Sequence, residues 1–173
     1  MSFTQLASDL TLGEDPGTHL LESLADFHAA LDHMARQARQ HIRIFTQELE
    51  HDFYDRAEFL EQVTPLFKQQ RDFRLQILLR DPNRAGKLGH RLVDLQQRLP
   101  TRCEIRQLPP EYQYIMDEYM IVDGRGMVKR FALGHLRGHC EFRSVPDAAK
   151  YSRQFEEIWE RSQPCMELRR LAL

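Results

Sequence analysis

The sequence lacks the long apolar runs that secretion and membrane insertion require. No segment approaches the roughly 18 consecutive apolar residues that a helix needs to span a bilayer. Residues 1–15 also lack the basic stretch followed by an apolar run with which a secretory signal begins. We therefore expect a cytoplasmic protein that does not bind membranes.

Cysteine is scarce, and the signatures of common cofactors are missing. The three cysteines, Cys103, Cys140 and Cys165, form no CxxC pair, which favours free thiols over zinc or disulfide chemistry. The sequence contains no GxSxG, no P-loop and no dinucleotide-binding glycine fingerprint. We therefore expect no cofactor.

A large excess of charge of either sign is also missing. Lysine and arginine number 24 against 26 aspartates and glutamates, so the formal net charge is -2. Such a chain does not coat nucleic acid by bulk electrostatics, and we find no strong nucleic-acid signal. Any anion site must be local. A hydrophobic content of 42% beside 29% charged residues is typical of a folded globular protein.

The 173 residues suit one domain. Residues 1–18 are predicted to be a loose N-terminal arm, and residues 19–173 a single α/β domain. Apolar residues recur at helical or strand spacing along that domain. They predict helices over 19–40 (with Thr18 as N-cap), 56–69, 88–99 and from 146 onward, and strands over 41–46, 73–79, 102–108, 119–122, 127–133 and 139–142.

The order of these elements predicts the fold class. Strands and helices alternate up to residue 108, which implies parallel strands joined by right-handed crossovers. Short strands follow, and the Asp123-Gly124 step is typical of a hairpin turn. We expect a mixed, mainly parallel sheet flanked by helices, with a late antiparallel hairpin.

This order, together with the segment Ile121-Val122-Asp123-Gly124 and a last helix carrying Phe155 and Trp159, resembles one lobe of the phospholipase D superfamily over residues 20–162. The resemblance implies an HxKxxxxD motif on the strand before the Asp-Gly turn. In that motif His attacks phosphorus, Lys holds phosphate oxygens, and Asp supports the arrangement. Residues two apart on a strand share one face, so His and Lys reach the same phosphate.

The catalytic residues of that motif are missing. Counted back from Asp123, Met116 stands in the place of His and Glu118 in the place of Lys. Methionine has no nucleophilic nitrogen, and a glutamate repels the phosphate that a lysine attracts. A register shifted by one residue presents Asp117 and Tyr119 instead. We therefore predict a non-catalytic phospholipase D-like domain that acts in binding or assembly.

Residues 125–143 are locally basic and form the candidate anion site. Such charges on a surface hairpin often only keep it solvated and discourage edge pairing. Alternatively, arginine forks bind the phosphate of a small molecule or the carboxylates of an acidic protein partner. The candidate residues are Arg125, Lys129, Arg130, Arg137 and His135.

A competing hypothesis is an enzyme of altered mechanism, which transfers phosphoryl groups or hydrolyses phosphodiesters with His135 or His139 as nucleophile or base. Two metal sites are conceivable, but ordinary structural roles explain the same residues better. One is a hard-cation site formed by Asp117, Glu118 and Asp123. The other is a soft-metal site of His135, His139 and Cys140, with Cys103 as a fourth ligand. We predict no metal.

The resemblance also bears on assembly. Full phospholipase D enzymes pair two lobes about a pseudo-twofold axis, and the resemblance implies that a single lobe forms a homodimer. The strand with Met116, Met120 and Val122 places apolar side chains where a catalytic seam would be polar, so this face is available for packing within the lobe or against a second copy.

Overall fold

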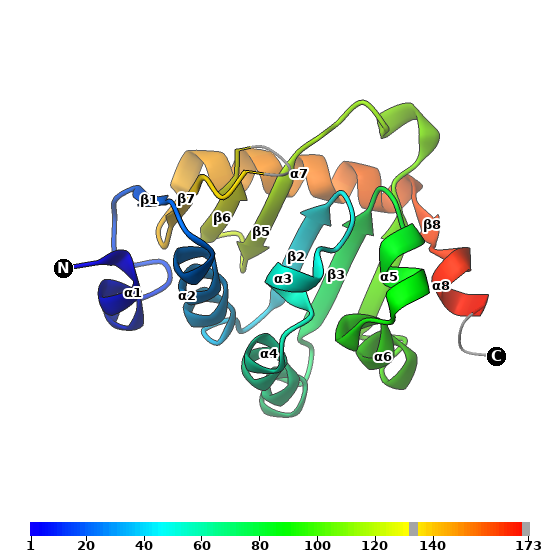
Figure 1. The fold of residues 1–173 in the computed structure, drawn as a ribbon, viewed down its shortest axis with the longest axis horizontal. Helices are drawn as coiled ribbons and strands as arrows, with labels where there is room; N and C mark the ends of the chain where they lie inside the picture. Colours follow the sequence, from blue (N-terminus) through cyan, green and yellow to red (C-terminus); the bar gives the residue numbers. More distant parts are fainter. Residues whose placement is uncertain (132–134, 171–173) are drawn as a thin grey trace.

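The computed structural model describes residues 1–131 and 135–170. One eight-stranded sheet runs through the molecule in the order β1-β7-β6-β5-β2-β3-β4-β8, and the two termini lie at opposite ends of it (Figure 1). The strands are β1 (His19–Leu21), β2 (His41–Thr46), β3 (Arg74–Leu79), β4 (Cys103–Gln107), β5 (Glu118–Val122), β6 (Gly126–Arg130), β7 (Gly138–Glu141) and β8 (Gln163–Pro164). The helices are α1 (Phe3–Leu6), η1 (Ala7–Asp9), α2 (Leu24–Ala35), α3 (His51–Tyr54), α4 (Ala57–Gln69), α5 (Asn83–Leu88), α6 (Arg91–Arg98), η2 (Pro110–Tyr112), α7 (Val145–Arg161) and α8 (Met166–Arg170).

The pairing of the strands confirms the predicted fold class, an α/β domain with a mixed sheet and a late antiparallel hairpin. The central strands β2, β3 and β4 are parallel, with Ile44 opposite Ile77 and Ile77 opposite Ile105. All other pairings are antiparallel, including β5 against β2 and the β5–β6 hairpin. Parallel pairing is thus confined to the strands that have crossover helices between them.

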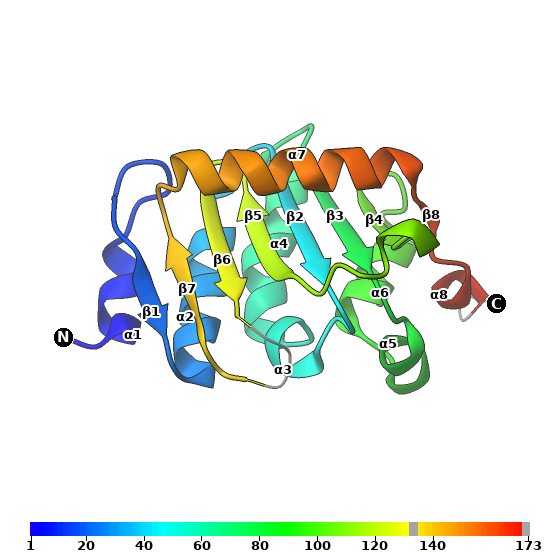
Figure 2. The same cartoon turned by 90° about the horizontal axis from the view of Figure 1, so that it is seen from above.

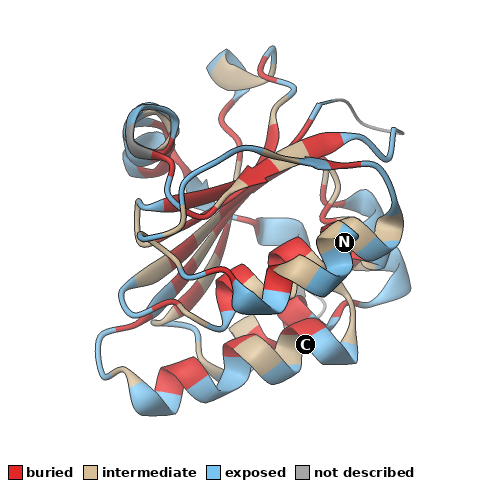
Figure 3. Cartoon of the chain, turned by 90° about the vertical axis from the view of Figure 1, so that its left-hand side faces the viewer, coloured by how far each residue is buried: buried red, intermediate tan, exposed pale blue. Residues whose placement is uncertain are grey.

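Two helical layers cover the sheet, as Figure 2 shows: α7 runs across the strands on one face, and α2, α4 and α6 lie on the other. Side chains of β5 alternate between the layers, because neighbouring residues of a strand point to opposite faces. Tyr119 and Ile121 pack beside Phe155 of α7, whereas Met120 and Val122 pack in the core under α2. The burial follows this arrangement, with buried residues along the strands and exposed ones on the outer faces of the helices (Figure 3).

The predicted helix 19–40 is shorter in the structure. Residues His19–Leu21 form the edge strand β1 on β7, with Leu20 opposite His139, and the helix begins only after Ser23. The Ser23 side chain accepts a hydrogen bond of 3.1 Å from the backbone N–H of Asp26, so Ser23 and not Thr18 is the N-cap. The error arose because the apolar spacing of a short strand cannot be distinguished from the first turn of a helix.

The predicted helix 88–99 corresponds to α6, which begins only at Arg91, and a separate helix, α5, ends at Leu88. Gly89 has a positive φ of 73°, which ends α5. His90 is the N-cap of α6, because its Nδ1 accepts a hydrogen bond from the backbone N–H of Leu92 at 3.1 Å. The predicted strand 127–133 corresponds to β6, which ends at Arg130, and residues 132–133 lie outside the described residues, as do Gly134 and 171–173.

Near the N-terminus, Phe3, Leu6 and Leu12 pack against the core next to α2. The division into an arm (1–18) and a domain (19–173) stays a prediction. Among the described helices, none is both long and apolar enough to cross a bilayer.

Candidate functional site

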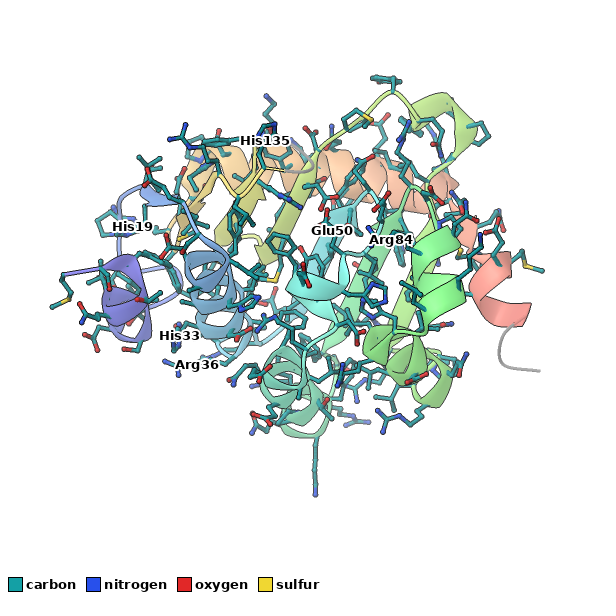
Figure 4. The ribbon with its side chains drawn as sticks, viewed as in Figure 1. His19, His33, Arg36, Glu50, Arg84 and His135 are labelled. Atoms are coloured by element: carbon teal, nitrogen blue, oxygen red, sulfur yellow. The ribbon has the colours of Figure 1, made fainter. Side chains whose placement is uncertain are left out.

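The first two motif positions lie at one end of the sheet, where β2 ends and β5 begins. Glu118 is the first residue of β5, opposite Arg130, the last residue of β6. Met116 precedes the strand and is 51% exposed. In Figure 4 Glu50 lies just past the end of β2, and His135 follows β6. We call this end of the sheet the motif end.

Glu118 is buried and hydrogen bonded. Its Oε1 accepts the backbone N–H of Gln47 at 2.6 Å and the hydroxyl of Thr46 at 3.2 Å. Burial raises the pKa of this carboxyl to about 7, because the charged form loses its hydration, and the two hydrogen bonds offset only part of this rise. Glu118 is therefore part of the core and does not project into a binding cleft.

Arg130 lies beside Glu118 and is equally engaged. Its guanidinium is 2.9 Å from the carboxylate of Glu50 and donates through Nε to the carbonyl of His135 at 2.7 Å. It also stacks 4.5 Å from the centre of the Phe53 ring. We call Thr46, Gln47, Glu50, Glu118 and Arg130 the buried polar cluster.

The space beside this cluster is nearly filled. A cavity of about 20 Å³ remains between α2, α3 and the strands. It is lined by Phe27, Leu31, Phe53, Tyr54, Glu118, Tyr119, Val128 and Arg130. Such a volume holds one water molecule at most. Where the superfamily motif would place a phosphate-binding lysine, this chain has a closed, side-chain-filled core.

Asp123, the residue from which the motif positions are counted, makes structural contacts. It has a positive φ of 55° in the β5–β6 turn. Its carboxylate accepts the backbone N–H groups of Arg39 at 2.8 Å, Gln40 at 2.8 Å and His41 at 3.0 Å. These hydrogen bonds hold the β5–β6 turn against the start of β2. The hard-cation site is not assembled, because Asp123 lies at the far end of β5 from Glu118.

The candidate anion-binding residues do not share one surface. Lys129 and Arg130 are neighbours in β6 and point to opposite faces of the sheet. The Lys129 ammonium contacts the hydroxyl of Tyr151 on α7, 4.5 Å from the centre of its ring. Arg130 is held in the buried polar cluster.

The other three candidates are exposed and lie at both ends of β6. Arg125 follows the β5–β6 turn, whereas His135 and Arg137 lie at the motif end between β6 and β7. Anion binding by these residues stays a prediction.

The soft-metal site is not assembled either, whereas a role of His135 or His139 as nucleophile or base stays a prediction. His139 is half-buried on β7, opposite Lys129, and burial lowers its pKa. Cys103 on β4 and Cys140 on β7 are separated by four strands, so Cys103 cannot be the fourth ligand of the soft-metal site considered above. Within residues 1–131 and 135–170, no three His, Cys, Asp or Glu side chains gather as a metal site would require.

Glu118 is surrounded by three residues that were not predicted from the sequence, Thr46, Gln47 and Glu50. The available signal was their position directly after β2, at the end of the sheet where β5 begins. In open α/β sheets, residues that follow parallel strands converge at one edge.

Comparison with solved structures places the fold in a known class. Nuc from Salmonella typhimurium, a phospholipase D family member, superposes with a TM-score of 0.61 at 12% identity, over 87% of this chain and 99% of that chain. NucT from Helicobacter pylori gives 0.62 at 10% identity, over 87% and 100%. The archaeal chromatin protein TrmBL2 gives 0.62 at 15% identity, over 93% of this chain but only 59% of its own. At these identities the likeness shows the fold, which is phospholipase D-like and confirms the resemblance.

The sequence itself matches a family model over residues 23–171, described as a domain of unknown function, DUF7931. The chain belongs to that family. No curated protein matches it.

Proposed function

We propose that this chain is a non-catalytic phospholipase D-like domain that acts in binding or assembly. The observation that carries the proposal is the buried Glu118 in the position of the phosphate-binding lysine, held by Thr46 and Gln47. An ionised Glu118 repels a phosphate, and a protonated one offers it no cation. Neither form supplies what the lysine of the motif supplies.

The position of the nucleophile supports the same conclusion. Met116 is half exposed at the motif end, and its thioether carries no proton and forms no phosphoenzyme of the kind that a histidine nitrogen forms. Both changes would have to be compensated by other residues for the superfamily chemistry to proceed. Among the described residues, the one guanidinium of the buried polar cluster belongs to Arg130, and it forms an ion pair with Glu50.

We predict that the purified protein does not hydrolyse bis(p-nitrophenyl) phosphate or phospholipid vesicles above the rate of a buffer blank, because it lacks both nucleophile and phosphate-binding cation. The measurement is release of nitrophenol or of the lipid headgroup, with an active phospholipase D as positive control. Turnover that His135→Ala or His139→Ala abolishes would overturn the proposal in favour of an enzyme of altered mechanism.

We also propose that the motif end is the interface of a homodimer. Met120 and Val122 pack inside the lobe and are not available to a partner, which decides between the two alternatives that the sequence left for them. Other apolar side chains are exposed at this end, where water contact is unfavourable. They are Tyr114 (77% exposed), Met116, Phe131 (58%) and Leu136 (42%), and they come from the two segments that flank β5 and β6.

We therefore expect light scattering at micromolar concentration to give twice the 20.5 kDa chain mass. The double variant Met116→Glu with Phe131→Glu should be monomeric, because charges would be buried at the interface. The matched control is Leu20→Glu, an equally exposed leucine on the edge strand β1, which should remain a dimer. A wild-type monomer, unchanged by salt, would contradict this proposal.

A further inference from the structure

A polar cavity lies at the opposite end of β5 from the buried polar cluster. It has a volume of about 400 Å³ and is bounded by the C-terminal ends of α2 and α4 and by the β5–β6 turn. Arg36, Arg39 and Arg125 line it. Figure 4 shows Arg36 at the end of α2, on the other side of the molecule from His135. Two segments distant in sequence thus bring arginines to one cavity, Arg36 and Arg39 from the end of α2 and Arg125 from the β5–β6 turn.

These arginines have no acidic partner in the part of the chain that the structure describes. No carboxylate within ion-pair distance of Arg36, Arg39 or Arg125 is present there, and Arg36 donates only to the carbonyl of Ser8, at 3.2 Å. Two carboxylates also line the cavity. Asp123 is engaged with backbone N–H groups through both oxygens, and Glu14 is exposed.

A second cavity, of about 440 Å³, continues the first. The two share Arg39 and Gln70, and the second adds Arg43, Arg71 and Arg74. Arg43 is paired with Glu156, and Arg74 donates to the carbonyl of Thr101. Counting both cavities and the Glu156 that pairs with Arg43, six arginines face four carboxylates, namely Glu14, Asp72, Asp123 and Glu156. The local formal charge is therefore +2, in a chain whose net charge is -2.

We propose that these joined cavities bind a ligand that carries two or more phosphate groups, with Arg39 at their junction and Arg36 and Arg125 in the first cavity. Guanidinium groups form paired, charge-assisted hydrogen bonds with phosphate oxygens, and several converging on one cavity suit a polyanion better than a single charge. The two adjoining cavities provide room for phosphates along a chain. The inference goes beyond the proposed function, because it concerns the other end of β5 and holds whether or not the motif end is inactive. Of the sequence-predicted anion residues, only Arg125 belongs to it.

Isothermal titration calorimetry with inorganic tripolyphosphate in low-salt buffer tests the proposal. We expect binding that weakens as salt increases and that Arg39→Ala weakens by about tenfold or more, since this arginine serves both cavities. Arg39→Ala keeps the backbone N–H that bonds Asp123, so the turn is preserved. The matched control is Arg84→Ala, an exposed arginine on α5, which should bind as the wild type does. Thermal melts of all variants verify folding.

A second titration uses a short single-stranded DNA oligonucleotide and separates the possible sources of the phosphates. Binding of tripolyphosphate that depends on Arg39 indicates a small polyphosphate-bearing ligand. Binding of the oligonucleotide alone, again lost in Arg39→Ala, assigns the same cavities to a nucleic-acid backbone. The proposal is overturned if neither probe binds, or if Arg39→Ala and Arg36→Ala bind both probes as tightly as Arg84→Ala does.

Discussion

Replacing Arg130 by methionine is expected to lower the free energy of unfolding by about 3–5 kcal/mol, the range found when one partner of a buried ion pair is removed. The Arg130 side chain is 8% exposed, and the side chain of Glu50, its ion-pair partner, is 20% exposed. Methionine fills much of the same space but leaves Glu50 without its cation, and the carbonyl of His135 without its donor. Urea unfolding of both proteins measures the difference.

The matched control for this substitution is Arg137→Met. Arg137 is exposed, and the hydrogen bond that it makes with Phe131 uses only its backbone carbonyl. We expect its loss to change the free energy of unfolding by less than about 0.5 kcal/mol. Adding Glu50→Gln to Arg130→Met should recover part of the stability, because the stranded charge is then gone. Equal unfolding midpoints for Arg130→Met and Arg137→Met would show that the buried polar cluster is not structural.

Replacing Glu118 by glutamine is expected to stabilise the protein by about 3 kcal/mol near pH 8 and to change little near pH 4.5. The pKa of Glu118 is about 7 in the folded protein and 4.5 as a model carboxyl. Between these values the folded chain keeps a proton that the unfolded chain has released, so stability falls as pH rises through this window and stays low above it. Glutamine cannot ionise, and its amide oxygen still accepts from Gln47 and Thr46.

The test is the free energy of unfolding across the same pH range for wild type, Glu118→Gln and the control Glu160→Gln, an exposed glutamate of α7. The wild type and the control should lose stability between about pH 4.5 and 7, relative to Glu118→Gln. Curves that run parallel for all three proteins would mean that Glu118 is ionised at no cost, and that the motif end is more hydrated than its burial indicates.

Local patterns in the sequence were enough to predict several elements closely. The strand 41–46 was predicted with its observed bounds. Its apolar residues alternate with polar ones, and polar segments on both sides mark where the strand begins and ends. The Asp123-Gly124 turn was recognised because both residues must adopt positive φ, which few other pairs tolerate. The edge strands β1 and β8 were missed, since short edge strands are defined by partners distant in sequence.

Counting residues back from Asp123 was enough to predict that Met116 and Glu118 occupy the His and Lys positions of the motif, because spacing along one strand can be read from the sequence alone. The surroundings of these two residues could be found only from the folded chain. Glu118 is held by residues about seventy positions earlier in the chain, where β2 ends beside β5. The convergence of Arg36 and Arg39 with Arg125 likewise depends on the pairing of β2 with β5, which brings the end of α2 against the β5–β6 turn. Contacts of this kind follow from the packing of the whole sheet, and no pattern of neighbouring residues encodes them.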